Sequence, residues 1–364
     1  MTRDTASGCA APHHVRALDG LRGVAVLLVF CVHAAGISAS VIFGADLDLT
    51  NILTLSTWPQ RVLYWLQRSH HGVFLFFVLS GYLIGHMWWP QPQASYRRFV
   101  WRRTLRIYPA FLLAFAASLG YASWTGTWSP PDWWRVLGNF VFFNGAPGSR
   151  VVPFNIVTWS LFYEMTFYVL FPLVVIAALR LAPRAAWWVP ALGIAVPLVA
   201  VVGGADPLVL CWSLLFCGVA LAFGQGRAVA TLARVPTVVV VLAYLAVTTS
   251  ALFDVMPMPV AILAFACVAV LVLAKSLAGG NGIATLLAAT PLVLLGRISY
   301  SFYLLHWMIT MLVAIEVGRH ASAWGVVAMS LVIFAGGFVL SAIAASLSWW
   351  AAERPYFRRG AIRT

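Results

Sequence analysis

Long apolar runs, separated by short polar or basic joints, dominate the hydrophobic pattern of this chain. Ten of these runs have the roughly 17–25 residues that a helix needs to cross a hydrocarbon core. Their approximate bounds are 23–43, 71–89, 104–123, 156–178, 187–203, 208–224, 236–253, 259–275, 298–317 and 324–348. A further apolar stretch, 283–296, is too short to span and is expected to lie along the interface or to re-enter. The pattern predicts an all-α, polytopic membrane protein with about ten transmembrane helices.

The composition agrees with this pattern. Hydrophobic residues make up 62% of the 364 positions and charged residues only 9%, too apolar a balance for the surface of a soluble fold. Residues 1–15 are polar and mixed, without the basic start, short apolar core and small-residue site of a cleavable signal. The first apolar run is therefore predicted to be a retained helix.

The basic residues predict the orientation. The formal net charge is +13, and with the N-terminus in the cytoplasm most of the arginines fall on the cytoplasmic side, as the positive-inside rule requires. Both termini are then cytoplasmic, and the excess of positive charge requires no nucleic acid partner. We divide the chain into an N-terminal tail (1–15), a transmembrane domain (16–357) and a basic C-terminal tail (358–364).

Several familiar cofactor and metal motifs are absent from the sequence. It contains no Walker loop and no dinucleotide-binding glycine fingerprint. Its five cysteines form no CxxC pair and fall mostly in apolar runs, which is typical of buried small hydrophobes. We therefore expect neither a bound metal ion nor a disulfide framework.

One long connection on the predicted outer side, residues 124–155, is rich in Trp, Pro and Gly. A loop of this length usually has a function. Its tryptophans suit either anchoring at the membrane interface or an aromatic platform for a sugar. The sequence leaves both interpretations open.

Three titratable side chains are predicted at one depth inside the membrane. His33 follows Arg22 by eleven residues, or roughly 16 Å along a helix, which places it near the midplane. Glu164 and His306 lie at comparable depths in two other runs. Interhelical hydrogen bonding alone would explain one such group, but three at one depth favour a shared interior site, with these three residues as candidate catalytic groups.

A basic cluster precedes the third apolar run. It consists of Arg97, Arg98, Arg102, Arg103 and Arg106. Anchoring to anionic membrane lipid is one interpretation, and a phosphate clamp is the other, because a guanidinium fork fits phosphate oxygens. Phosphates held at the cytoplasmic end by Arg22 and the cluster, with a long arm reaching toward His33, would match the shape of an acyl-coenzyme A.

An ordered series of motifs resembles the acyltransferase-3 family of bacterial membrane O-acyltransferases, over most of residues 16–357. The series comprises AspGlyLeuArgGly (19–23), the Arg22–His33 spacing, PheValLeuSerGlyTyrLeuIle (77–84), the Arg103–Arg106 pair, SerLeuPheTyrGlu (160–164), PheTyrValLeuPhePro (167–172), GlyArgIleSerTyrSerPheTyrLeuLeuHis (296–306) and GluArgPro (353–355). The resemblance implies that Arg22, His33, Arg103 and Arg106 are essential, and we add Arg102 as a further ligand for the donor.

The resemblance also implies the activity. Family members transfer an acyl group, usually acetyl, from cytosolic acyl-CoA to a carbohydrate or other hydroxyl acceptor. The expected co-substrate is acetyl-CoA, and the expected acceptor is an exopolysaccharide repeat unit, an O-antigen or a lipid-linked glycan. The expected place is the bacterial inner membrane, in contact with membrane lipid and in association with polysaccharide-assembly proteins.

The residues allow more than one mechanism. In direct transfer, neutral His33 acts as general base on the acceptor hydroxyl. Glu164 would orient His33 or bind the acceptor, and Ser160, Tyr163 or Tyr300 would stabilise the oxyanion. A covalent acyl-His33 intermediate is the alternative within this class. A proton-coupled transporter with a midplane His/Glu site is the alternative outside it.

Overall fold

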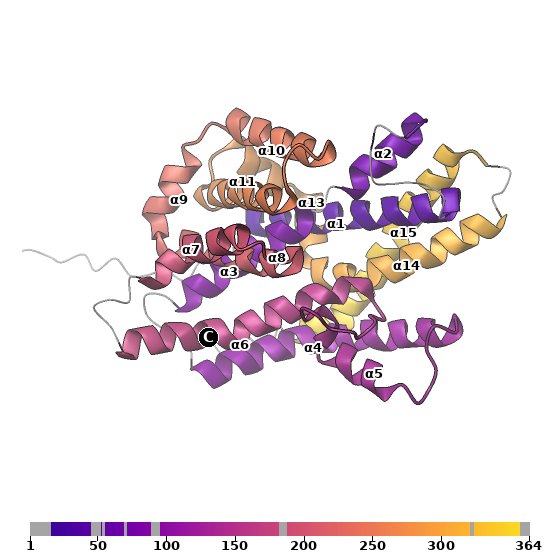
Figure 1. Ribbon diagram of the computed structural model, residues 1–364, viewed down its shortest axis with the longest axis horizontal. Coiled ribbons are helices and arrows are strands. Elements are labelled where there is room, and N and C mark those ends of the chain that lie inside the picture. The colour runs from indigo at the N-terminus through magenta and orange to yellow at the C-terminus, as the bar shows by residue number, and fades with distance from the viewer. Residues whose placement is uncertain are drawn as a thin grey trace, which may run out of the picture.

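The computed structural model describes residues 16–44, 52, 55–68, 71–88, 95–181, 188–320 and 324–356, and all regular elements within these ranges are helical (Figure 1). The two terminal tails predicted from the sequence lie outside the described residues. This confirms the all-α prediction for the part of the chain that carries the apolar runs.

The longer helices follow the apolar pattern closely. They are α1 (Arg16–Phe43), α3 (His71–Trp88), α4 (Tyr96–Trp124), α6 (Trp159–Leu181), α7 (Trp188–Val202), α8 (Pro207–Phe223), α10 (Thr237–Leu252), α11 (Met258–Ala278), α14 (Ser299–His320) and α15 (Val326–Ser348). Shorter helices join them: α2 (Trp58–Gln67), α5 (Trp133–Phe140), α9 (Gln225–Ala233), α12 (Gly282–Leu287), α13 (Thr290–Arg297), the 3₁₀ turns η3 (Phe143–Gly145) and η4 (Ile156–Thr158), and the π-helical turn η5 (Trp349–Glu353). Each predicted run therefore coincides with one helix.

Seven spans in the described part are long and apolar enough to cross a membrane on their own. An eighth results if α8 and α9, which meet at a bend of 103°, count as one span. Helices α7 and α10 are apolar but shorter. The protein is thus a multi-pass membrane protein, while a count of ten crossings and the cytoplasmic position of both ends remain predictions. The short stretch 283–296 forms α12 and α13.

Helix α1 is the central element of the fold, and it packs against α2, α3, α13, α14 and α15 (Figure 1). Its first turns approach α12 and α13 at glycines. A Cβ atom at Gly20 would overlap the carbonyl oxygen of Leu287, and one at Gly296 would overlap the carbonyl oxygen of Asp19. The AspGlyLeuArgGly motif therefore lets the two backbones touch, which places the start of α14 beside α1.

A second close approach joins α3 to α8. A Cβ at Gly81 would overlap the carbonyl oxygen of Leu215, and a Cβ at Gly218 would overlap that of Val78. Contacts between small residues are a common way to hold membrane helices together, because lipid tails supply no hydrophobic drive for helix association. This contact fixes the depth and rotation of α3, which lines the site described below.

We expect Gly81→Ala to lower stability by about 1–3 kcal/mol, since the added methyl group must displace the α8 backbone. Thermal unfolding of the purified protein in detergent measures this effect. Gly120→Ala is the control, because Gly120 is an exposed position of α4 with open space around its Cβ direction. Equal melting temperatures for the two variants would contradict the assigned packing.

Candidate functional site

A cavity of about 90 Å³ lies between α1, α3, α4, α6 and α14. We call it the arginine cavity. Its lining residues are Arg22, Val73, Phe76, Phe77, Leu79, Ser80, Leu83, Arg103, Arg106, Ser160, Leu161, Glu164, Tyr168, Ser299, Tyr300 and Tyr303. Among these described side chains three are guanidinium groups and one is a carboxylate. The cavity is therefore electropositive and suits an anion.

The arginines are held in place by their neighbours. Arg22 forms an ion pair with Asp19, one turn earlier on α1, at 3.2 Å. The Arg103 guanidinium lies 5.2 Å from the ring centroid of Tyr168 and 5.4 Å from that of Phe99. Arg103 Nη2 also donates to Met87 Sδ at 3.0 Å, so these contacts orient the guanidinium before an anion arrives and leave its remaining N–H groups to bind an oxyanion.

Glu164 occupies the side of the cavity that faces these arginines. Its Oε1 accepts hydrogen bonds from the hydroxyl of Ser80, at 3.2 Å, and from that of Tyr168. The Tyr168 ring also contacts the Arg103 guanidinium, so Glu164 orients the ring against which Arg103 packs. The described contacts therefore connect Glu164 to the arginines.

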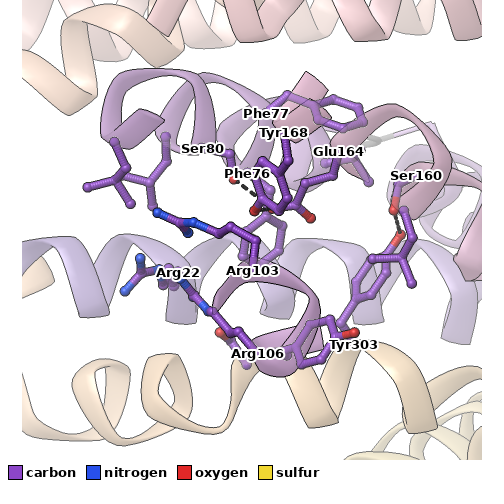
Figure 2. A pocket seen from close by; sticks show the side chains of 16 residues that line it. Arg22, Phe76, Phe77, Ser80, Arg103, Arg106, Ser160, Glu164, Tyr168 and Tyr303 are labelled. Atoms are coloured by element: carbon purple, nitrogen blue, oxygen red, sulfur yellow. Dashed lines mark hydrogen bonds between the residues drawn. The ribbon is translucent and has the colours of Figure 1, made fainter. Parts of the chain in front are cut away.

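Figure 2 shows this arrangement from close by. Arg22, Arg103 and Arg106 gather on one side, with Glu164 and Tyr168 beside them, and Ser160 and Tyr303 lie at the opposite end. The hydroxyls of Ser160 and Tyr303 are 2.8 Å apart, and Tyr303 donates to the carbonyl of Val157 at 2.7 Å. Neutral hydroxyl groups thus close the end of the cavity away from the arginines.

The two predicted midplane histidines form a pair. His33 Nδ1 lies 2.8 Å from His306 Nε2, and the rings stack with centroids 5.1 Å apart. His306 is fully buried on α14, and its Nδ1 lies 2.8 Å from the carbonyl oxygen of Tyr303 and 3.1 Å from that of Phe302. The pair joins α1 to α14, and its depth in the membrane stays a prediction.

This geometry assigns the protons of the neutral pair. A carbonyl oxygen only accepts, so His306 Nδ1 carries the proton and its Nε2 is an acceptor. His33 Nδ1 must then donate to that nitrogen, which leaves the lone pair of the neutral His33 ring on Nε2. His33 can take up a proton at Nε2 without changing its bond to His306, which is the requirement for a general base.

A second cavity, of about 380 Å³, lies on the other side of Tyr303. We call it the apolar cavity. Its lining residues are Val29, Val32, His33, Arg68, His71, Val73, Phe74, Trp159, Cys211, Ala251, Met258, Ala261, Ile262, Phe265 and Tyr303. Val73 and Tyr303 line both cavities, so the two adjoin at these side chains. His33 faces the apolar cavity, and Arg22 faces the arginine cavity.

The structure therefore brings most of the predicted site residues together in two adjoining groups. Arg22, Arg103, Arg106 and Glu164 line the arginine cavity, whereas His33 and His306 form the pair beside it. Arg102 is exposed on α4 and is not among the lining residues. Neither is Tyr163, whose buried hydroxyl has no hydrogen-bond partner among the described residues.

Several polar lining residues were not singled out from the sequence, among them Ser80, His71 and Tyr303. Ser80 and His71 belong to a strongly apolar run, where the pattern indicates packing. Tyr303 lies three positions before His306 on the same helix, so the i, i+3 spacing places both on one face. That spacing is the one signal that could have identified it.

The long connection 124–155, predicted to lie on the outer side, is held by internal hydrogen bonds and contacts α14. Arg135 donates to the carbonyls of Thr127, at 2.6 Å, and Val152, at 3.0 Å, and Asn155 donates to the carbonyl of Leu304 on α14 at 2.6 Å. Trp133 and Trp134 on α5 remain more than half exposed. Interfacial anchoring and a sugar platform both remain predictions for these rings.

The described part of the chain is thus a multi-pass helical bundle with an arginine-lined cavity beside a buried histidine pair. Comparison with known proteins makes this specific. The sequence model of a family described as "Acyltransferase domain", the acyltransferase-3 family, matches residues 15–347. Among curated proteins, "Acyltransferase MdmB" of Streptomyces mycarofaciens is 29% identical over 325 residues, which cover 80% of this chain and 78% of that protein. No solved structure matches.

The chain belongs to the acyltransferase-3 family, because the match covers most of its length. It is therefore a multi-pass membrane enzyme of acyl transfer. The resemblance predicted from the ordered motifs is confirmed.

We expect Arg103→Ala to weaken the binding of inorganic pyrophosphate roughly 10- to 100-fold, the range that corresponds to one charge-assisted hydrogen bond of about 1.5–3 kcal/mol. Titration of the purified protein by calorimetry measures the dissociation constant. Arg102→Ala is the matched control, since it removes the same charge from the neighbouring, exposed position. Similar losses in both variants would indicate a general surface charge effect and would contradict a defined cavity site.

Proposed function

We propose that this enzyme transfers an acyl group, in the first place acetyl, from cytosolic acyl-CoA to a hydroxyl of a carbohydrate acceptor. The observation that supports this proposal is the spacing of two residues on α1, one in the arginine cavity and one in the histidine pair. Arg22, in the arginine cavity, and His33, in the pair, are eleven residues or roughly 16 Å apart. An elongated donor with phosphates at one end and a thioester at the other fits this separation.

The arginines would bind the donor. Guanidinium groups at Arg22, Arg103 and Arg106 suit the phosphates of coenzyme A, which they can hold through paired hydrogen bonds. The pantetheine arm would run along the less charged part of the cavity toward Tyr303, and its thioester would reach the junction with the apolar cavity. Glu164 would act as a positioning residue, because it orients the Tyr168 ring beneath Arg103.

His33 would act as the general base. Its Nε2 takes the proton of the acceptor hydroxyl while the oxygen attacks the thioester carbonyl. The tetrahedral oxyanion then collapses, the carbon–sulfur bond breaks, and the coenzyme A thiolate leaves with the proton returned by His33. The Ser160 hydroxyl, which lines the arginine cavity beside Tyr303, would turn from the Tyr303 oxygen to donate to the oxyanion, while the Tyr303 proton stays on the Val157 carbonyl.

His306 would act as a positioning residue for His33. Its Nε2 accepts the Nδ1 proton of His33, and the carbonyl oxygens of α14 fix its own tautomer. The arrangement resembles the way a buried acceptor orients a catalytic imidazole in other enzymes. The proposed location is the bacterial inner membrane, with association to polysaccharide-assembly proteins as a further expectation.

We expect His33→Ala to lower acyl transfer at least 100-fold, the lower end of the contribution of a general base. Label appearing on glycans after incubation of membranes with labelled acetyl-CoA measures the reaction, at matched expression of each variant. His320→Ala is the control, because His320 is an exposed histidine at the end of α14. Full transfer by His33→Ala would show that the base lies elsewhere. Absence of labelled glycan with the wild-type protein would exclude a sugar acceptor.

We expect His306→Ala to lower kcat at least tenfold while the KM for acetyl-CoA stays within about twofold, because His306 touches His33 and not the arginine cavity. Steady-state kinetics of the purified variant separate the two constants. His306→Asn can still accept from His33 and should recover part of kcat. A rise in KM with unchanged kcat would place His306 in donor binding and contradict the positioning role.

A further inference from the structure

The apolar cavity has the size and lining of a small-molecule site. Its volume of about 380 Å³ falls within the roughly 300–1,000 Å³ of such sites. Most of its walls are hydrocarbon, from Val29 and Val32 on α1, Phe74 on α3, and Ile262 and Phe265 on α11. A molecule bound here would bury apolar surface over most of its length.

Two histidines supply polar atoms within these walls. His33 lines the cavity, and the bond to His306 leaves the lone pair of the neutral ring on Nε2. His71, which is buried at the first position of α3, lies with Nδ1 3.3 Å from the hydroxyl of Tyr244, and its ring centroid is 3.5 Å from that of Phe265. Few polar groups in fixed positions within an apolar wall are typical of a site that orients its ligand.

The cavity extends toward the end of the bundle that is remote from the arginines. Helix α3 lines it with its first turn, His71 to Phe74, and lines the arginine cavity with the turns that follow, as far as Leu83. Arg68 follows the last residue of α2, and Met258 is the first residue of α11. Helix ends therefore surround this part of the cavity. In the predicted topology they lie on the outer side of the membrane.

The charge of this cavity disfavours the donor. Its one lining guanidinium among the described residues, Arg68, is ion-paired with Asp254 at 3.5 Å and lies 5.2 Å from the Tyr64 ring centroid. A free sugar is disfavoured as well, because most of its hydroxyls would face hydrocarbon and lose their hydrogen bonds to water. A molecule with one hydroxyl near His33 and an apolar remainder avoids both costs: it needs no opposite charge, and few of its polar groups lose hydrogen bonds to water.

We propose that the apolar cavity is the acceptor site and that it takes an amphipathic alcohol. The acceptor hydroxyl lies at His33, and an apolar body lies against Phe74, Ile262 and Phe265. The acceptor enters from the end of the bundle opposite the arginine cavity. This inference rests on the proposed function and narrows its acceptor to hydroxyl compounds, glycosides included, that carry a substantial apolar part.

The first test compares decyl β-D-glucoside with methyl β-D-glucoside as acceptors in nanodiscs, with labelled acetyl-CoA as donor. We expect the decyl compound to have at least a tenfold higher kcat/KM. Ala261→Phe fills the cavity and should remove this advantage, whereas Val260→Phe, at the exposed neighbouring position, should preserve it. An equal effect of Ala261→Phe on both glucosides overturns the proposal. So does an effect on the acyl-chain length of the donor, because the cavity would then hold the donor.

The second test does not depend on turnover. A decyl glucoside with a diazirine in its alkyl chain should label the segment of α11 that contains Ile262 and Phe265, and Ala261→Phe should abolish this labelling. Specific labelling without acyl transfer would support the site while contradicting the proposed function. Acyl transfer without labelling of this segment would support the function and overturn the site.

Discussion

The hydrogen bond between His33 and His306 is the interaction on which the rest of the site depends. A titratable ring inside an apolar bundle is costly unless its polar atoms form hydrogen bonds. Here α14 supplies them: the Tyr303 carbonyl accepts from His306 Nδ1, and His306 Nε2 accepts from His33 Nδ1. This series of hydrogen bonds requires α1 and α14 to lie close together. The glycine contacts at Gly20 and Gly296 bring the backbone of α1 against those of α12 and α13 just before α14 begins, so the motif that sequence reasoning treated as a family marker has a packing role as well.

Separation of charge along the bundle is the second constraint. Guanidinium groups lie at one end of α1, a neutral histidine pair lies in the middle, and hydrocarbon walls follow beyond it. Tyr303 stands at the boundary, since its side chain lines both cavities and its carbonyl fixes His306. The Tyr303 side chain thus shapes the junction of the cavities, and its carbonyl holds the proton of His306 on Nδ1, which in turn sets the tautomer of His33.

The position of each site residue along its helix follows from the sequence, but its contacts with the neighbouring helices do not. The rise of a helix sets how deep His33, Glu164 and His306 lie, whereas the rotation and the neighbours of each helix decide which side chains meet. The sequence suggested that Glu164 orients His33, but the described partner of His33 is His306, and those of Glu164 are Ser80 and Tyr168. The same limit separates Arg103 from Arg102, because consecutive residues of a helix point about 100° apart. The sequence alone does not show which face of α4 points inward. The packing of α4 against α6 and α14 shows which of its arginines do.

The two cavities, which adjoin at Val73 and Tyr303, would also resolve a conflict between the two substrates of the proposed acyl transfer. A polyphosphate donor needs a solvated, positive site, whereas the thioester needs an environment in which water does not compete with the acceptor. A site that served both needs in one chamber would either solvate the thioester or strip water from the phosphates at high cost. Placing the arginines and the apolar walls on opposite sides of Tyr303 lets each substrate keep a suitable environment, and only the reacting atoms must meet. In the proposed mechanism the base must lie close to this boundary, and His33, which lines the apolar cavity and is hydrogen-bonded to His306 on α14, is the residue proposed for that role.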